Sequence, residues 1–202
     1  MFITFEGIEG GGKSTQVQKI SDALTKAGYN IVQTKEPGGT AIGQELRRMI
    51  LDPNQRFHSP YTEVMLFFAD RLEHVETVIK PALASGKIVL CDRYIDSTIA
   101  YQIGGRGMPK PLIETLTQLV DLKPDLTLLF DLSPEEGLQR AKQRAALDRF
   151  EQESIDFHSR IRHSYLDQAK KEPDRIKVIS ASCDIEPLFE RLMKDYILPS
   201  LS

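Results

Sequence analysis

Five short apolar segments recur along the chain, separated from one another by stretches with helical periodicity. The strand candidates are Phe2–Glu6, Ile31–Thr34, Lys87–Asp92, Leu126–Asp131 and Ile176–Ser180, several of which are continuous apolar runs. Such runs are typical of strands buried on both faces of a parallel sheet. Helices are predicted at Ser14–Ala27, Ala41–Leu51, Pro60–Ala84, Asp96–Ile103, Pro111–Asp121, Pro134–Leu147, Gln152–Lys171 and Pro187–Leu198.

The alternation of strands and helices predicts an α/β fold with a five-stranded parallel sheet flanked by helices in three layers. Pro60, Pro111 and Pro134 are expected to start helices, whereas Gly28 and Gly86 are expected to end them. No internal repeat or low-complexity linker interrupts the pattern, so residues 1–202 are expected to form one domain. In such folds the active site lies at the carboxyl ends of the strands.

The first strand candidate runs into a glycine-rich segment that opens a helix. Residues Gly7-Ile8-Glu9-Gly10-Gly11-Gly12-Lys13-Ser14 fit the pattern G-x-x-x-x-G-K-S/T, and Thr15 follows. In this context backbone N–H groups point at one spot and can hold a phosphate. The lysine reaches the β- and γ-phosphates and the serine hydroxyl can ligate Mg²⁺. We therefore expect a nucleoside-triphosphate site.

The ends of the next two strands carry further polar residues. The second is followed by Glu36-Pro37-Gly38-Gly39-Thr40, and the third ends at Asp92, with Arg93 beside it. A carboxylate at this place commonly holds Mg²⁺, although Asp92 could instead cap the next helix. The guanidinium of Arg93 suits a phosphate.

Phe67 and Arg71 lie four residues apart in the helix predicted at Pro60–Ala84, and therefore on one face of it. An aromatic plane beside a guanidinium can stack on a nucleobase and bond to its edge. The alternative is a core phenylalanine next to a solvated arginine. If this pair stood alone, the alternative would be favoured.

The segment from Arg140 to Arg149 is rich in basic residues and bridges two predicted helices. It is either a solvated helix end or a mobile lid whose arginines close over the triphosphate. Ile8–Gly12 contain neither arginine nor lysine, and phosphoryl transfer needs positive charge on the migrating group. We therefore expect residues 140–153 to form a lid.

The composition of the chain restricts its expected binding partners and its expected cellular compartment. The net charge of −3 argues against a nucleic-acid or anionic-membrane partner held by bulk charge. No apolar run approaches the length of a membrane span, and the phosphate-binding strand begins too early to leave room for a signal peptide. Cys91 lies in an apolar run, far in sequence from Cys183, and is expected to be a free thiol. A cytoplasmic protein is expected.

With these residues identified, the chain resembles the bacterial type of the thymidylate kinase (dTMP kinase) family of P-loop nucleoside monophosphate kinases. The matching segments are F-E-G-x-E-G-G-G-K-S-T, T-K-E-P-G-G-T, L-F-F-A-D-R, C-D-R-Y-I-D-S-T-I-A-Y-Q, P-D-L-T-L-L-F-D-L and R-A-A-L-D-R-F-E-Q-E-S. The resemblance extends over nearly the whole chain. The resemblance implies a P-loop NTPase fold with a small lid, and a homodimer formed through the predicted helix Pro60–Ala84.

The resemblance also implies roles for individual residues. Phe67 would stack on thymine, Arg71 would bond its O4, and Tyr101 would exclude a 2′-hydroxyl. The acceptor site as a whole would comprise Glu36, Pro37, Arg47, Phe67, Arg71, Arg93, Ser97, Thr98, Tyr101 and Gln102. The ATP site would comprise Gly7, Ile8, Glu9, Gly10, Gly11, Gly12, Lys13, Ser14, Thr15 and Arg144. The catalytic residues would be Lys13, Arg93, Arg144, Arg149 and Glu9, and Mg²⁺ would be held by Ser14 and Asp92.

The implied reaction is transfer of the ATP γ-phosphoryl group to dTMP, with Mg²⁺ as cofactor. Two alternatives remain at this point. In a deoxynucleoside kinase a sugar hydroxyl would attack, and Glu36 could be its general base. A regulatory GTPase would read guanine with N-K-x-D, but Asn30 and Asn54 are followed by Ile31 and Gln55.

Overall fold

The sheet has five parallel strands in the order β2-β3-β1-β4-β5. The computed structural model describes residues 1–144 and 147–201, and of Arg144 only the backbone. The strands are β1 (Phe2–Glu6), β2 (Ile31–Lys35), β3 (Ile88–Asp92), β4 (Leu126–Asp131) and β5 (Ile176–Ser180). β1 is buried along its whole length because it lies between β3 and β4. The predicted five-stranded parallel α/β fold is confirmed.

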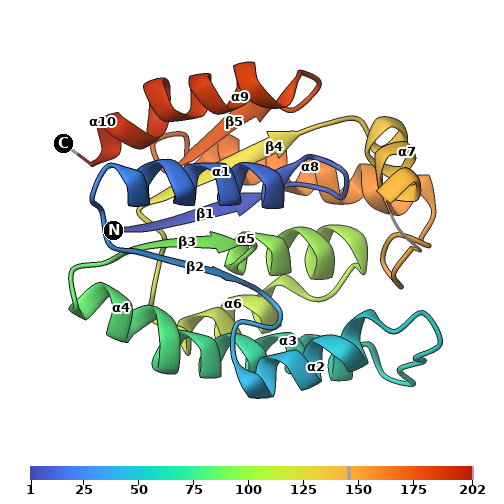
Figure 1. Ribbon diagram of the computed structural model, residues 1–202. Helices are drawn as coiled ribbons and strands as arrows, with labels where there is room; N and C mark the ends of the chain where they lie inside the picture. Colours follow the sequence, from blue (N-terminus) through green and yellow to red (C-terminus); the bar gives the residue numbers. More distant parts are fainter. Residues whose placement is uncertain (145–146, 202) are drawn as a thin grey trace.

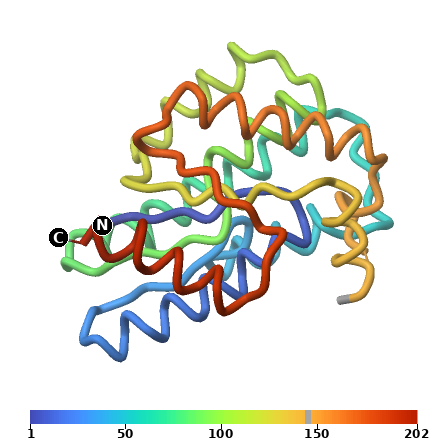
Figure 2. Tube along the Cα trace, turned by 90° about the horizontal axis from the view of Figure 1, so that it is seen from above, coloured from blue at the N-terminus to red at the C-terminus, as the bar shows by residue number. Residues whose placement is uncertain are grey.

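Helices cover both faces of the sheet (Figure 1). On one face, α1 (Lys13–Lys26) lies beside α9 (Ile185–Leu192). On the other face, α8 (Ile155–Lys171) packs on β4 and β5, while α4 (Lys80–Ala84) packs on β3. The remaining α-helices are α2 (Ala41–Leu51), α3 (Pro60–His74), α5 (Ile95–Thr98), α6 (Lys110–Gln118), α7 (Pro134–Arg144) and α10 (Leu198–Ser200). Figure 2 shows the two termini on the same side of the molecule, away from α7.

Among residues 1–144 and 147–201, three helical segments have π geometry, which the sequence pattern did not reveal: η1 (Val75–Ile79), η2 (Ile99–Gly105) and η3 (Met193–Ile197). η1 joins α3 to α4 and is followed by Lys80 and Pro81; η3 joins α9 to α10 and is followed by Leu198 and Pro199. A proline inside a helix lacks its N–H and clashes with the carbonyl four residues earlier, and a widened turn relieves both problems. The predicted helix Pro60–Ala84 therefore continues through Pro81 instead of stopping there.

Other boundaries moved by a few residues. α8 begins at Ile155 and not at Gln152, because the Ser154 side chain caps the helix by accepting a hydrogen bond from the backbone N–H of Phe157. The helix predicted at Asp96–Ile103 instead begins at Ile95 and continues through η2 to Gly105. Of the helix predicted at Pro134–Leu147, residues 145 and 146 lie outside the described part.

The strand register brings the carboxyl ends of the central strands to one edge. Phe5 pairs with Asp92, and Glu6 pairs with Leu129 of β4. The loop between β1 and α1, the turn after β2 and the start of α5 therefore meet at this edge, on the side where α7 also lies (Figure 1). In the described part of the chain, no helix is long and apolar enough to cross a membrane.

Candidate functional site

The loop between β1 and α1 has a backbone that requires glycine. Gly7 has a φ of 132° and Gly10 a φ of 73°, and a Cβ on Gly10 would overlap the carbonyl oxygen of Gly137 on α7. The loop therefore packs backbone to backbone against α7. The N-cap of α1 is Gly12, which offers no side-chain cap, so the first N–H groups of the helix remain available for an anion.

Lys13 lies inside this loop. Its ammonium group donates to the carbonyl oxygens of Ile8 at 2.7 Å and Gly7 at 3.1 Å. Burial, together with the nearby charge of Arg93, lowers the pKa of Lys13 to about 8. A phosphate group in the loop would offer this buried cation the negative charge that the carbonyl groups lack.

Ser14 and Asp92 meet although they are 78 residues apart in sequence. The Ser14 hydroxyl donates to a carboxylate oxygen of Asp92 at 2.5 Å. A hydroxyl and a carboxylate are hard oxygen donors, and Mg²⁺ usually takes only one or two protein ligands and completes its shell with phosphates and water. The two residues therefore fit a magnesium site.

A cavity of about 400 Å³ opens at the strand ends beside the loop. It brings together most of the expected site residues: Glu9, Gly10, Gly11, Gly12, Lys13, Ser14, Thr15, Glu36, Pro37, Arg47, Phe67, Arg71, Asp92, Arg93, Ser97, Thr98, Tyr101 and Gln102. Gly7 and Ile8 of the same loop do not line the cavity but contribute their carbonyl groups to Lys13. One cavity thus contains both the phosphate-binding loop and the residues expected around the acceptor.

Arg93 is the central cation of this cavity. It adopts a left-handed backbone conformation with a φ of 70°, which is unfavourable for a residue with a side chain and occurs often at functional sites. Its guanidinium donates to the carbonyl of Gly7 at 2.9 Å, to Ser97 and Tyr165 at 3.2 Å, and to Glu9 at 3.2 Å. The phosphate-binding loop, α5 and α8 are therefore linked through one side chain.

Glu9 is held as a carboxylate at the boundary between the two halves of the cavity. Its Oε1 accepts hydrogen bonds from Arg93 and from the Tyr101 hydroxyl, and its Oε2 lies 3.3 Å from Nδ1 of the buried His158. Burial alone would raise the pKa of Glu9, but His158, Arg93 and Lys13 outweigh burial and lower it. Glu9 is therefore an anion that fixes Arg93 and Tyr101.

A chain of buried polar groups also lines the cavity. The Arg71 Nε donates to Glu36 at 2.7 Å, and its Nη1 donates to the Thr98 hydroxyl at 2.7 Å. The second carboxylate oxygen of Glu36 lies 2.9 Å from Nδ1 of His74. Arg71 is only 2% exposed, so the interpretation as a solvated surface arginine is wrong. Phe67 lines the same cavity and packs against Phe150.

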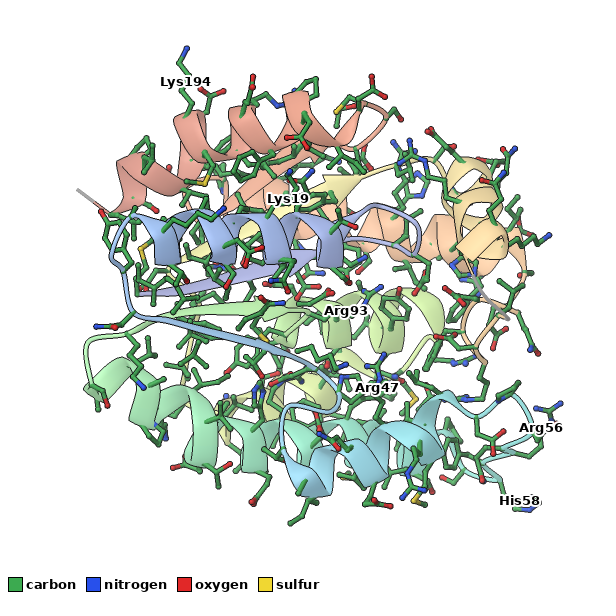
Figure 3. The ribbon with its side chains drawn as sticks, in the orientation of Figure 1. Lys19, Arg47, Arg56, His58, Arg93 and Lys194 are labelled. Carbon is green, nitrogen blue, oxygen red and sulfur yellow. The ribbon has the colours of Figure 1, made fainter. Side chains whose placement is uncertain are left out.

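Arg47 adds a second cation on the acceptor side. Its guanidinium donates to the carbonyl of Pro37 at 2.8 Å. Arg47 and Arg93 line the same cavity, and burial, followed by the charge of Arg93, lowers the pKa of Arg47. Figure 3 shows both arginines between the layers at the strand ends, whereas Arg56 and His58 lie at the outer end of the loop between α2 and α3.

The arginines expected in the lid lie in different places. The side chain of Arg144 lies outside the described part of the structure. Arg149 does not line the main cavity, because its guanidinium pairs with Glu63 at 2.6 Å and stacks on Phe150. It lines a second cavity of about 490 Å³ instead. Arg140, which lay in the predicted lid but was not assigned to the site, does line the main cavity.

Sequence reasoning missed several further residues at the site. Lys35, Leu51, Tyr94, Arg140, Asp148, Phe150 and Glu151 also line the main cavity. Behind it, Glu6 accepts hydrogen bonds from the Tyr94 N–H at 2.7 Å and from Ser97 at 2.6 Å. Burial, followed by the charge of Asp96, raises the pKa of Glu6 to about 7. A glutamate at the end of a largely apolar strand is the sequence signal that points to Glu6.

Comparison with known proteins places the chain in one family. The Thymidylate kinase family model matches residues 5–192. The thymidylate kinase of Desulfosudis oleivorans is 50% identical over 190 residues, covering 90% of this chain and 89% of the relative. That of Exiguobacterium sibiricum is 46% identical, covering 97% of this chain and 93% of the relative. The crystal structure of thymidylate kinase from Ehrlichia chaffeensis superimposes with a TM-score of 0.78 at 36% identity, covering 96% of this chain and 97% of that one. The chain belongs to the thymidylate kinase family.

Proposed function

We propose that the protein transfers the γ-phosphoryl group of ATP to dTMP, giving ADP and dTDP for dTTP synthesis, and that the whole chain acts as one thymidylate kinase domain. The observation that carries this proposal is that one cavity is lined by Lys13 of the phosphate-binding loop, by Arg93, which donates to that loop, and by Arg71 of the buried polar chain. Membership of the family supports the same substrates.

The acceptor needs no general base. The second pKa of a phosphate monoester is near 6, so dTMP is mostly a dianion at pH 7. The task of the protein is to align two polyanions and to offset their repulsion. Lys13 serves the donor phosphates, and Arg93 and Arg47 serve the acceptor phosphate. Glu9 holds Arg93 in place through its Oε1.

Ser14 and Asp92 are the residues that would hold Mg²⁺. When bound, the ion supplies positive charge to the phosphates of ATP and orients them. Among the described residues there is no cluster of three or more histidine, cysteine, aspartate or glutamate side chains that could hold a metal. The donor set is therefore small, as in sites where phosphates and water complete the shell of Mg²⁺.

The lid role of residues 140–153 belongs to this proposal. Arg140 lines the main cavity, and its guanidinium is held by Glu136 at 2.6 Å and by the carbonyl of Ala181 at 3.0 Å. We assign Arg144 and Arg149 to the donor phosphates in the closed state. For Arg149 this assignment requires the ion pair with Glu63 to open.

A homodimer formed through α3 is also proposed. Tyr61 and Met65 lie one turn apart on this helix and are 49% and 45% exposed. Two large apolar side chains on one helical face suit burial against a second copy of the chain. The cytoplasm is the proposed compartment, because Cys91 and Cys183 are both free thiols.

The geometry argues against the deoxynucleoside kinase alternative. Glu36 would be its general base, but the residue is 3% exposed and its carboxylate oxygens are engaged by Arg71 and His74. The carboxylate is therefore committed to contacts inside the buried polar chain, which does not suit a general base that must reach a sugar hydroxyl.

The test is a coupled assay of ADP release with dTMP, dUMP, dCMP, dGMP and thymidine as acceptors. The proposal expects dTMP to have the highest kcat/KM and thymidine to be inactive. Turnover of thymidine at a rate comparable with that of dTMP would overturn the proposal.

A further inference from the structure

Glu63 and Gln102 connect the acceptor cavity with the second cavity. Glu63 lies on α3, four residues before Phe67, and its side chain is 6% exposed. Gln102 lies in η2, lines the main cavity and is 1% exposed. The Gln102 amide Nε2 donates to Oε1 of Glu63 at 2.9 Å. The amide oxygen of Gln102 is buried and has no hydrogen-bond partner within the described structure.

The contact with Glu63 decides which way the amide of Gln102 faces. A carboxylate only accepts hydrogen bonds, so the NH₂ group must point toward it. Turning the amide over would bring two acceptor oxygens together and leave the NH₂ group without this partner. The unpaired oxygen of Gln102 is therefore a consequence of the position of Glu63.

Glu63 cannot easily move away from Gln102. Its Oε2 pairs with Arg149 at 2.6 Å, and the Arg106 Nε lies 3.4 Å from its Oε1. Arg106 is in turn held by Glu153, at 2.5 Å. The carboxylate is thus held by cations that line the second cavity, and Arg106 keeps this role when Arg149 leaves in the proposed closed state.

We propose that Glu63 is a positioning residue for base recognition, which holds Gln102 so that its amide oxygen accepts the N3–H of a thymine ring. This inference rests on the proposed function. The acceptor role of Gln102 complements the donor role of Arg71, which would donate to the 4-carbonyl group of the same ring. An acceptor beside a donor fits thymine and uracil, whereas cytosine has an unprotonated N3 and a 4-amino group and would leave both protein groups unpaired.

The experiment compares dTMP with 5-methyl-dCMP, two acceptors whose bases differ only at positions 3 and 4. It measures kcat/KM for both in the parent, Glu63→Gln, Gln102→Leu and the double variant. A glutamine at position 63 can donate as well as accept, so the Gln102 amide becomes free to turn over. The dTMP/5-methyl-dCMP ratio should fall about tenfold in Glu63→Gln, the size of one buried polar mismatch. In the Gln102→Leu background, Glu63→Gln should change the ratio no further.

Two controls separate positioning from general damage. Glu153→Gln removes the other carboxylate that holds Arg106, and it should leave the ratio unchanged because Glu153 does not contact Gln102. The dTMP/dUMP ratio should stay constant in every variant, because uracil presents the same edge at positions 3 and 4.

The inference and the proposed function fail in different ways. If the parent phosphorylates dTMP but Gln102→Leu keeps the parental dTMP/5-methyl-dCMP ratio, the inference is overturned and the proposed function stands. This outcome does not depend on whether Glu63→Gln folds. An equal fall in Glu63→Gln and Glu153→Gln would also overturn it. A parent that does not phosphorylate dTMP would overturn both.

Discussion

The guanidinium of Arg149 lies 2.6 Å from the carboxylate of Glu63, and its Nε donates to the carbonyl of Ile50 at 2.8 Å. Both side chains are mostly buried, with 12% and 6% exposure. In this state Arg149, which follows α7 in the chain, binds to both α2 and α3. Arg149 therefore stabilises the fold in the described state, independently of its proposed role at the donor phosphates.

Replacing Arg149 should destabilise the protein. Arg149→Ala leaves Glu63 without its nearest cation, and breaking a largely buried pair costs about 3 kcal/mol. The measurement is the free energy of unfolding in urea. Arg48→Ala is the matched control, because Arg48 pairs with Glu45 on the exposed surface of α2, where such a pair is worth less than about 1 kcal/mol. Equal losses in the two variants would contradict the structural role of Arg149.

Lys13 should be essential for transfer but not for folding. Lys13→Ala removes the cation in the phosphate-binding loop, and we expect kcat to fall roughly 10²–10³-fold, as for other preorganised charges at phosphoryl groups. Lys19→Ala is the control from the same helix, because Lys19 pairs with Glu186 away from the cavity. Circular dichroism checks that both variants fold. A folded Lys13→Ala with kcat within tenfold of the parent would refute the donor site.

The sequence predicted the sheet and the phosphate-binding loop well because both have local signals. Continuous apolar runs mark β1, β3 and β4, and the spacing from Gly7 to Ser14 determines the loop. The sequence could not predict side-chain contacts between segments that only the tertiary structure brings together. Glu63 has no motif around it, and its neighbours Gln102 and Arg149 are 39 and 86 residues away in the chain.

The π segments show a second limit of sequence reasoning. η2 widens the helix that carries Tyr101 and Gln102, although no proline marks it between Ile99 and Gly105. The helical periodicity predicted a helix there correctly but not the widened turn. Gln102 lies in this turn and donates to Glu63 of α3, a contact between distant segments that helical periodicity does not indicate.

Tyr101 should control the discrimination against ribonucleotides. Its hydroxyl donates to Glu9, and its ring packs beneath Arg93, with 5.1 Å between the guanidinium carbon and the ring centroid. Tyr101→Ala should raise the ribo/deoxy ratio of kcat/KM by removing the wall against a 2′-hydroxyl. Tyr101→Phe keeps the ring and should keep the ratio. If the ratio in Tyr101→Ala matches the parental one, sugar discrimination belongs to another residue.

Glu6 should make stability depend on pH. Its pKa is raised from the ordinary 4.5 to about 7, so between these values the folded protein keeps a proton that the unfolded chain releases. The contribution of Glu6 to stability is therefore complete below pH 4.5 and is lost as the pH rises to 7. The loss should total roughly 3 kcal/mol, at about 1.4 kcal/mol per pKa unit.

Comparison of the parent with Glu6→Gln in urea unfolding across this range measures the contribution. The parental stability should fall relative to that of the variant as the pH rises. Glu172→Gln is the control, because the pKa of Glu172 is lowered to about 2 and its contribution does not change between pH 4.5 and 7. A constant difference between the parent and Glu6→Gln across the window would contradict the raised pKa.

Arg71 should read the base and not merely hold the nucleotide. Its guanidinium is fixed by Glu36 and Thr98 at the end of the acceptor cavity, which leaves its orientation little freedom. It would offer a donor to the 4-position, where thymine and uracil have a carbonyl group and cytosine has an amino group. Arg71→Ala should therefore lower the dTMP/dCMP ratio of kcat/KM at least about tenfold. The dTMP/dUMP ratio depends on one methyl group in an apolar pocket, worth only about 10–200-fold, and should stay nearly constant. Steady-state kinetics with the three acceptors would show the difference, and ratios that fall together would make Arg71 a general binding residue.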